Sequence, residues 1–341
     1  MVSPRQLDAP AGLGQHYRFT MEPDPLCIRG IVPIIPTPFD DGEQIAWGEL
    51  RSLIDFACTA GVSAVCLPAY ASEFYKLSED ERARLVVEAV SHARGRVPVV
   101  GQVNYASAAN ATRWAAHLET SGVSAICVAV PRLFPLSETD LFRYFDRILG
   151  AIKVTLIVQD FNPTGPSLSV RFLSDLNREH PNFRYIKIEE PLSAAKVEAI
   201  LQETGGRVGV LEGWGGMYMP ELVPAGICGV MPGLALSDIL GLVFRLLSDS
   251  RREEALEIFQ AVLPQIVFSL QNMELFHHAE KRLLQARGIL GSARVREATR
   301  ELSAAEKEHI NFLNGRVLAL LDRLKLPWNS AASVGSSTSI R

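Results

Sequence analysis

Short apolar runs alternate with longer amphipathic segments along most of the chain. The apolar runs are rich in β-branched residues and are apolar at both odd and even positions, which is typical of parallel strands covered on both faces. Eight such runs occur, at residues 31–35, 63–68, 97–103, 124–130, 154–160, 184–189, 208–211 and 226–231. The amphipathic segments between them predict helices at residues 47–60, 78–94, 108–121, 137–151, 169–179 and 193–204.

Repetition of a strand and a helix predicts a (β/α)8 TIM barrel, because eight such units close most economically into a ring. The alternative is an open doubly wound sheet, which usually has a glycine-rich loop after its first strand. Here the first strand leads into Pro36-Thr37-Pro38-Phe39-Asp40, a segment without glycine. This segment favours the barrel. Ser78, followed three residues later by Glu81, predicts a capped helix start.

The pattern changes after the eighth apolar run, where only helices are predicted, at residues 238–247, 252–270, 273–287 and 304–324. Both ends of the chain lack a sustained period and are rich in small or turn-forming residues. We therefore expect an N-terminal extension (residues 1–25), a barrel (26–240), a C-terminal helical region (241–326) and a polar tail (327–341).

Composition points to a small-molecule ligand. The formal net charge is −4 and no block of basic residues alternates with aromatic ones, so neither nucleic acid nor a membrane surface is an expected partner. No apolar stretch approaches the roughly 20 residues of a membrane span. The five cysteines are widely spaced, which is typical of buried thiols in a reducing compartment, and the start of the chain lacks the order of a signal peptide. A cytoplasmic location is expected.

Lys187 lies between Ile186 and Ile188, in the middle of a predicted buried strand. A buried ammonium is costly to desolvate, so it either pairs or loses its proton, and a neutral amine is a nucleophile toward carbonyl groups. Lys187 is therefore a candidate Schiff-base lysine. The alternative is a structural ion pair with Glu189, two positions further along the same face of the strand.

Several segments resemble the dihydrodipicolinate synthase and N-acetylneuraminate lyase family of class I aldolases, over roughly residues 28–325. They are Gly30-Ile31-Val32-Pro33, Thr37-Pro38-Phe39, the run from Ser72 to Arg82, Pro131 with Pro135, and Ile186-Lys187. The resemblance implies a TIM barrel in which the lysine of the sixth strand, here Lys187, forms an imine with pyruvate or another 2-oxo acid. It also implies that no metal or organic cofactor is needed and that the enzyme is a homotetramer.

The chain departs from this family at the residues that transfer protons. The usual Gly-Thr-Thr-Gly-Glu loop reads Ala69-Tyr70-Ala71-Ser72-Glu73, so the relay hydroxyl is absent at Ala71. On the fifth strand, Gln159-Asp160 replaces the Tyr-Asn pair, and Leu133 replaces the second tyrosine of the relay. The arginine that holds the distal carboxylate has no counterpart in Asn162-Pro163-Thr164-Gly165. A lysine-biosynthetic dihydrodipicolinate synthase is therefore not expected, and the chain resembles a divergent branch.

Roles for the remaining candidates follow from their chemistry. Tyr70 is a candidate catalytic proton donor, or else a packing aromatic. Backbone N–H groups of Ala71 and Ser72 are expected to bind the substrate carboxylate, with the Ser72 hydroxyl as a further donor; a plain turn is the alternative. The Gln159 amide suits a substrate oxygen. Glu189 either pairs with Lys187, replaces the missing proton relay or contacts the substrate.

The sequence thus predicts a class I lyase that forms a Schiff base between Lys187 and pyruvate or a 2-keto-3-deoxy sugar acid. The reaction is either aldol cleavage or condensation, or dehydration. Two alternatives stay open. One is a non-catalytic protein that binds or senses a 2-oxo acid on the same fold. The other is a metal-dependent barrel enzyme with Glu189, Glu190 and Glu212 as ligands. Gly213-Trp214-Gly215-Gly216, after the seventh strand, either lines the barrel mouth or forms a plain turn.

Overall fold

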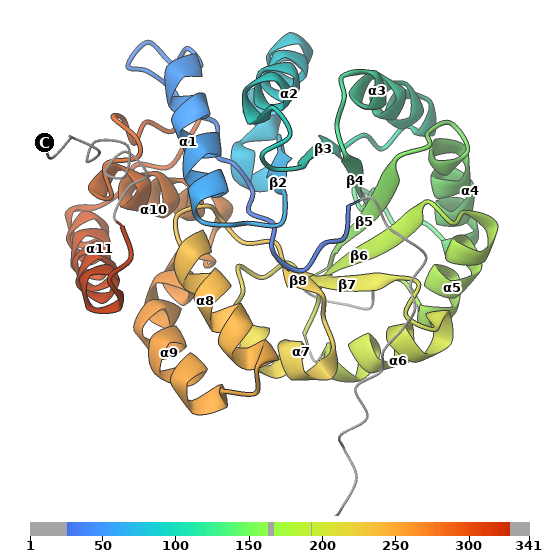
Figure 1. The fold of residues 1–341 in the computed structure, drawn as a ribbon. Coiled ribbons are helices and arrows are strands. Elements are labelled where there is room, and N and C mark those ends of the chain that lie inside the picture. The colour runs from blue at the N-terminus through green and yellow to red at the C-terminus, as the bar shows by residue number, and fades with distance from the viewer. Residues whose placement is uncertain (1–25, 163–166, 192, 328–341) are drawn as a thin grey trace, which may run out of the picture.

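A computed structural model describes residues 26–162, 167–191 and 193–327, and its centre is one sheet of eight parallel strands (Figure 1). The strands follow one another around the sheet in the order β1-β8-β7-β6-β5-β4-β3-β2. Their bounds are β1 Gly30–Ile31, β2 Val65–Leu67, β3 Val99–Val103, β4 Ala125–Ala129, β5 Thr155–Phe161, β6 Phe183–Glu189, β7 Gly209–Glu212 and β8 Gly229–Val230.

Backbone hydrogen bonds close this sheet into a barrel. Ser63 N donates to Ile31 O (2.8 Å), and Cys66 N donates to Pro33 O (2.9 Å). Ile35 N then donates back to Cys66 O (3.0 Å). β1 and β2 are the first and last strands of that order, and these bonds join β2 to β1 and the segment that follows it. The predicted (β/α)8 barrel is therefore confirmed.

Helices surround the barrel on the outside (Figure 1). The predicted cap at Ser78 is present, since Glu81 N donates to Ser78 Oγ (3.2 Å) and Ser78 N donates to the Glu81 carboxylate (2.9 Å). The barrel helices are α1 Trp47–Thr59, α2 Glu79–Ala93, α3 Ala108–Thr120, α4 Glu138–Leu149, α5 Val170–Glu179, α6 Ala194–Thr204, α7 Met219–Ala225 and α8 Ser237–Ser248. Sequence periodicity missed α7, because it has only seven residues and contains Pro220 and Pro224.

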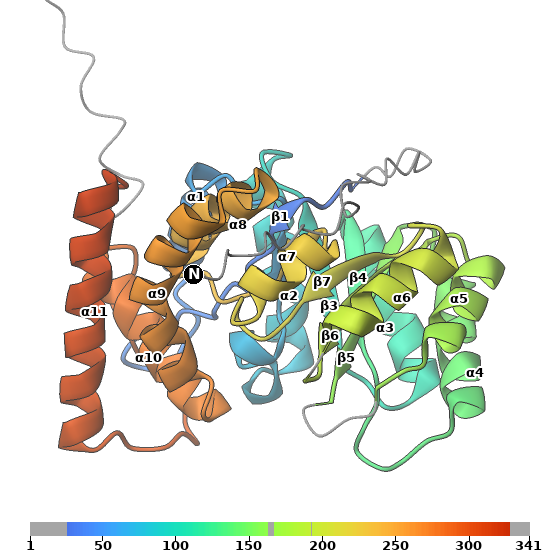
Figure 2. The ribbon, with the colours of Figure 1, turned by 90° about the horizontal axis from the view of Figure 1, so that it is seen from below.

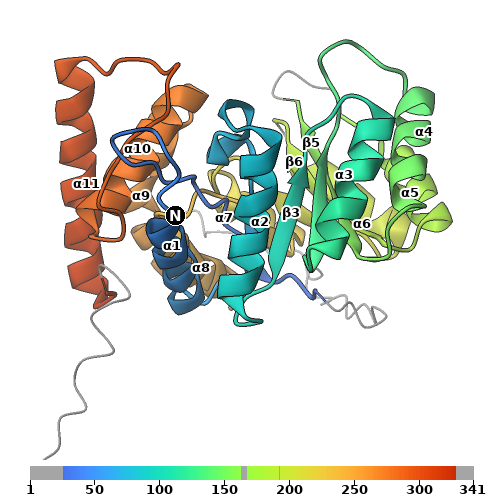
Figure 3. The same ribbon diagram turned by 90° about the horizontal axis from the view of Figure 1, so that it is seen from above.

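Three further helices pack beyond α8: α9 Arg252–Ser269, α10 Met273–Ala286 and α11 Ala304–Leu324. Figure 2 and Figure 3 show them stacked beside the barrel, with α11 at the outer edge. The expected domain boundary at residue 240 falls inside α8, which packs on β1 and so belongs to the barrel wall. The expected N-terminal extension and nearly all of the polar tail lie outside the described residues. Within the described part of the chain, none of the helices is long and apolar enough to cross a membrane.

The barrel interior is apolar at one end and polar at the other. Ile28 N donates to the Tyr185 hydroxyl (3.0 Å), and this contact plugs the end of the barrel where the strands begin. Cys66, Cys127 and Ile157 are fully buried above this plug. Buried polar side chains, among them Gln159, Lys187 and Glu189, lie at the carboxyl ends of the strands, where barrel enzymes bind their substrates.

Candidate active site

Lys187 and Glu189 form a buried ion pair at the carboxyl end of β6. The Lys187 Nζ lies 2.7 Å from Glu189 Oε1, and each side chain is only 6% exposed. The two residues share one face of the strand because they are two positions apart. The strand partner of Lys187 on β5 is Gln159. Three of the predicted site residues are therefore brought together.

A chain of side-chain amides fixes the orientation of Gln159. Gln102 Nε2 donates to Gln159 Oε1 (2.9 Å) and to Asn104 Oδ1 (3.1 Å). The amide of Gln159 must then point its nitrogen toward Glu189, to which Nε2 donates at 3.2 Å. Glu189 consequently receives hydrogen bonds from both Lys187 and Gln159.

The charge state of Lys187 follows from two opposing effects. Burial lowers the pKa of its amine, but the charge of Glu189 and the hydrogen bond to it outweigh burial, so the pKa of Lys187 is raised above its ordinary value. The lysine is thus an ammonium ion in the free protein. It becomes a nucleophile only after it passes a proton to a neighbouring base, and Glu189 is in contact with it.

The loop after β2 turns twice through short 3-10 helices, η1 Tyr70–Ser72 and η2 Phe74–Lys76. Ser72 is fully buried, and its hydroxyl donates to Ile35 O (2.6 Å) and accepts from Ala69 N (3.0 Å). The hydroxyl expected to contact the substrate is therefore already used to hold the loop. Ser72 N is also bonded within the turn, to Ala69 O (2.9 Å). The predicted contact with the substrate carboxylate therefore depends on the backbone N–H group of Ala71.

Tyr70 forms part of an aromatic wall beside the ion pair. Its ring lies 5.1 Å from that of Phe74 and 6.2 Å from that of Phe161. Burial raises the pKa of the Tyr70 phenol, and the charge of Glu189 raises it further while that of Lys187 lowers it. The phenol therefore stays protonated and can act as a hydrogen-bond donor. A pocket of about 300 Å³ opens here, lined by Tyr70, Ala129, Val130, Arg132, Leu133, Gln159 and Phe161.

Arg132 is a residue of this pocket that sequence reasoning did not identify. Its Nε donates to Asp160 Oδ1 (2.9 Å), and Asp160 Oδ2 accepts from Leu168 N (2.6 Å). Asp160 is buried and faces away from Lys187, so it ties together the loops after β4 and β5. The sequence offered only a weak signal, an arginine after the fourth strand at Pro131-Arg132-Leu133.

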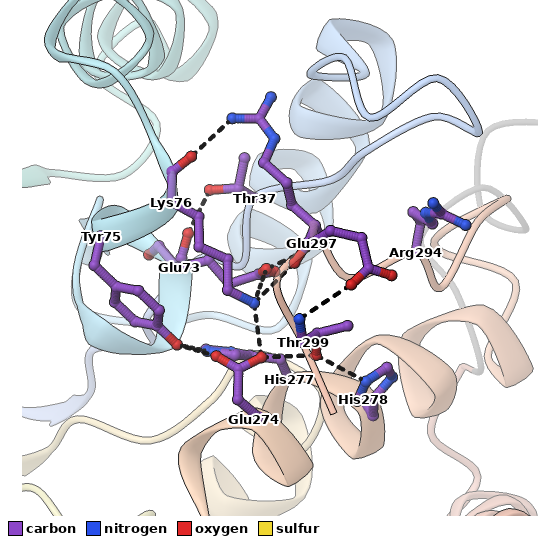
Figure 4. Close-up of polar contacts among 12 residues, drawn as sticks. Thr37, Glu73, Tyr75, Lys76, Glu274, His277, His278, Arg294, Glu297 and Thr299 are labelled. Carbon is purple, nitrogen blue, oxygen red and sulfur yellow. Dashed lines mark hydrogen bonds and ion pairs between the residues drawn. The ribbon is translucent and has the colours of Figure 1, made fainter. Parts of the chain in front are cut away.

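A buried ion network ties the loop after β2 to the C-terminal helices. Glu73 is fully buried in the left-handed backbone region (φ 60°). Its carboxylate lies 2.5 Å from Lys281 Nζ and 3.2 Å from Lys76 Nζ. Lys76 Nζ also lies 2.7 Å from Glu274, and Figure 4 shows it between the two glutamates. Arg296 N completes the set by donating to Glu73 (3.2 Å).

We expect Lys281→Met to lower the free energy of unfolding by about 3 kcal/mol, because removing one partner of a buried ion pair leaves the other charge undercompensated. Urea unfolding followed by circular dichroism measures this change. Arg251→Met is the control, since its ion pair with Glu254 is more than half exposed and contributes little. Equal midpoints for Lys281→Met and the unmodified protein would show that the network does not stabilise the fold.

Gly213 leaves room for the ion pair. A β-carbon built at this position would lie 2.3 Å from Glu189 Cγ and 2.6 Å from Lys187 Cε, well inside contact distance. Its backbone N donates to Ile188 O (3.1 Å), which holds it against β6. Gly213, the first residue of the predicted Gly213–Gly216 turn, therefore forms part of the wall around the two charged groups.

The three glutamates of the metal alternative are engaged separately. Glu189 pairs with Lys187, and Glu190 pairs with Lys196 at 2.6 Å. Glu212 accepts from Gly216 N (2.8 Å). Among residues 26–162, 167–191 and 193–327, no group of three or more histidine, cysteine, aspartate or glutamate side chains is placed to hold a metal ion.

Comparison with known proteins consistently identifies one enzyme family. The sequence profile of the Dihydrodipicolinate synthetase family matches residues 27–314. L-2-keto-3-deoxyarabonate dehydratase of Azospirillum brasilense is 27% identical over 304 residues, which are 88% of this chain and 96% of that protein. A 4-hydroxy-tetrahydrodipicolinate synthase of Bartonella quintana is 29% identical, but the match spans only about half of it (55%).

Solved structures show the same fold. Dihydrodipicolinate synthase from Rhodopseudomonas palustris superposes with a TM-score of 0.79 at 23% identity, covering 87% of this chain and all of that one. YagE of Escherichia coli K12, solved in complex with pyruvate, gives a TM-score of 0.76 at 22% identity over 87% of this chain and 99% of its own.

Proposed function

This chain belongs to the dihydrodipicolinate synthetase family, and on that premise we propose that it forms a Schiff base between Lys187 and a 2-oxo acid and removes water from a 2-keto-3-deoxy sugar acid. The lyase class is shared with named relatives, among them a dehydratase and an aldolase. The imine, the substrate and the choice of dehydration are our proposal. A homotetramer, a cytoplasmic location and the domain bounds stay predictions.

The observation that supports the proposal most directly is the contact of 2.7 Å between Lys187 Nζ and Glu189 Oε1. In a first step, Glu189 takes a proton from the ammonium group. The freed amine then attacks the carbonyl carbon C2 of the substrate, and a water molecule leaves as the C=N bond forms. In this proposal the Ala71 N–H group binds the substrate carboxylate and the Gln159 amide binds a substrate oxygen atom.

The protonated imine withdraws electrons, so the C3–H bond of the bound sugar acid becomes acidic. A base must remove this proton, and an acid must protonate the C4 hydroxyl as it leaves as water. No hydroxyl relay is present at Ala71, Leu133 or Gln159. Glu189, in contrast, contacts Lys187 Nζ, the atom that would become the imine nitrogen, and C3 would then be two bonds from that atom. We assign both proton transfers to Glu189, with the Tyr70 phenol as a hydrogen-bond donor. Hydrolysis of the imine then consumes one water and returns Lys187.

Dehydration is favoured over aldol cleavage by the coverage of the relatives. The dehydratase of Azospirillum brasilense matches over nearly its full length, whereas the putative aldolase YagE matches over 55% of its sequence. Similarity to YagE, solved with pyruvate, supports a small 2-oxo acid as the ligand.

Borohydride reduction tests the imine. With pyruvate or a 2-keto-3-deoxy sugar acid present, the protein should gain the mass of the acid less one oxygen atom, and peptide mapping should place the addition on Lys187. Product analysis should show loss of water from the sugar acid without release of pyruvate. Absence of trapping across a panel of 2-oxo acids, with the fold intact, would contradict the proposal; pyruvate release would identify an aldolase. Trapping without any single-turnover product would favour the non-catalytic binder.

Glu189→Gln separates imine formation from dehydration. We expect dehydration to fall by about 10²-fold, because the amide cannot transfer protons. Trapping on Lys187 should persist, and its pH dependence should move to lower pH, since loss of the carboxylate removes the effect that raises the pKa of the amine. Mass spectrometry of trapped protein from pH 6 to 10 measures the shift. A profile unchanged from that of the unmodified protein would exclude Glu189 as the group that controls Lys187.

A further inference from the structure

Glu212 is a buried carboxyl group directly behind the site. It ends β7, is 1% exposed, and pairs in register with Ile188. Leu211, one position earlier, belongs to the cluster inside the barrel. Neighbouring residues of a strand face opposite sides, so Glu212 points outward, away from the space where a substrate binds.

The Glu212 carboxylate holds the turn formed by residues 213–218, here called the β7 turn. Glu212 Oε2 accepts from Gly216 N (2.8 Å), and Oε1 lies 3.5 Å from Tyr218 N. These N–H groups precede the first turn of α7, where backbone donors have no partner within the helix. Gly215 and Gly216 have positive φ angles (64° and 87°), so the chain reverses sharply around the carboxylate.

The β7 turn is also in contact with the proposed catalytic groups. Its first residue, Gly213, lies so close to Glu189 and Lys187 that a β-carbon would overlap both side chains. Its second residue, Trp214, places its ring 5.9 Å from that of Phe161, which lines the substrate pocket. A shift of this turn would therefore change the space available to both charged groups and to the pocket wall.

We propose that Glu212 is a positioning residue for the Lys187–Glu189 pair, and that it acts by fixing the β7 turn through Gly216 N and Tyr218 N. This role rests on the proposed function of Lys187 and Glu189. Glu212 itself forms no bond to the substrate. It keeps Gly213 in the place that holds the lysine and the carboxylate 2.7 Å apart.

Electrostatics agree with this geometry. Burial raises the pKa of Glu212 to about 7, hydrogen bonds from Gly216 and Tyr218 oppose this effect, and the charges of Glu189 and Lys187 act on it in opposite directions. The group therefore titrates near neutral pH, within range of the two catalytic charges. Its ionised form is the stronger acceptor for the two N–H groups of the turn.

Glu280 provides a matched control. It too is buried, accepts a backbone bond (Ala235 N, 2.7 Å), and has its pKa raised by burial to about 7. A β-carbon built at Gly233 would lie 2.6 Å from its carboxylate. Arg287 is the charged group that acts on the pKa of Glu280, and neither Lys187 nor Glu189 contributes to its shift.

The experiment compares Glu212→Gln with Glu280→Gln by two readouts. The first is competitive labelling of Lys187 with acetic anhydride across pH, which reports the pKa of the amine without any substrate. The second is single-turnover dehydration of a 2-keto-3-deoxy sugar acid. We expect Glu212→Gln to lower the labelling pKa of Lys187 and to slow dehydration on the order of tenfold. The inflection near pH 7 should disappear from its rate profile, and both readouts should stay unchanged in Glu280→Gln.

Two results would overturn the inference: a Glu212→Gln protein equal to the unmodified one in both readouts, or equal changes in Glu280→Gln, which would indicate general loosening of the fold. Failure of the proposed function is distinguishable from either. In that case borohydride would not trap any 2-oxo acid on unmodified Lys187, while the labelling comparison would still decide whether Glu212 positions the lysine.

Discussion

Lys187→Met is expected to reduce dehydration by at least about 10³-fold and to remove all borohydride trapping, because none of the described residues that line the pocket carries an amine that could form the imine instead. Methionine has nearly the length of the lysine stem and keeps the packing against Gly213. Steady-state rates and intact-protein mass spectra after reduction measure the two effects. Lys153→Met is the control, since this lysine is exposed on the barrel surface and should leave both readouts unchanged.

Folding must be monitored in the same variant. Without the ammonium group, Glu189 keeps only the Gln159 amide as a donor among its described contacts, so the melting temperature should fall. The double variant Lys187→Met with Glu189→Gln removes the unpaired charge and should regain stability without regaining activity. A Lys187→Met protein that keeps a tenth or more of the dehydration rate would contradict a mechanism through Lys187.

Gly213→Ala is expected to lower the dehydration rate by at least about 10²-fold, because one added methyl group displaces the side chains of both proposed catalytic residues. The built β-carbon would lie 2.4 Å from Glu189 Oε1 and 2.6 Å from Lys187 Cε, so at least one of these groups must move. The rate of trapping on Lys187 should fall as well. Stopped-flow turnover and the time course of borohydride trapping measure the two rates.

The matched control is Gly315→Ala, on the outer helix α11. A β-carbon there meets nothing within 4 Å, and alanine is the better helix former, so activity should be unchanged and stability equal or slightly higher. If Gly213→Ala retained full activity, the contact between the β7 turn and the ion pair would have no bearing on the reaction.

The fold could be predicted from sequence because its signal is local. Eight apolar runs with β-branched residues appear in the structure as eight strands, and the cap at Ser78 forms as expected. Helix α7 was missed, because seven residues with two prolines are too few to show a period.

The candidate site was predictable only in part. Lys187, Gln159 and Glu189 could be identified because each is a polar residue in an apolar strand, and strand register places them side by side. The sequence does not show that the Ser72 hydroxyl donates to Ile35 O, because the two residues are 37 positions apart. The sequence offers Glu212 only as a ligand in the metal alternative, because its contact with Gly216 N depends on a turn that folds back over the carboxylate.

The pair between Glu73 and Lys281 joins residues 208 positions apart, and this separation has a consequence for synthesis of the protein. At about 5–20 residues per second, the ribosome needs roughly 10–40 s to produce Lys281 after Glu73. During that interval the nascent loop after β2 has a carboxylate destined for complete burial but lacks its main partner. The face of the barrel that carries the candidate site is therefore expected to mature last, after α10 has left the ribosome, and to be the part most dependent on chaperones during translation.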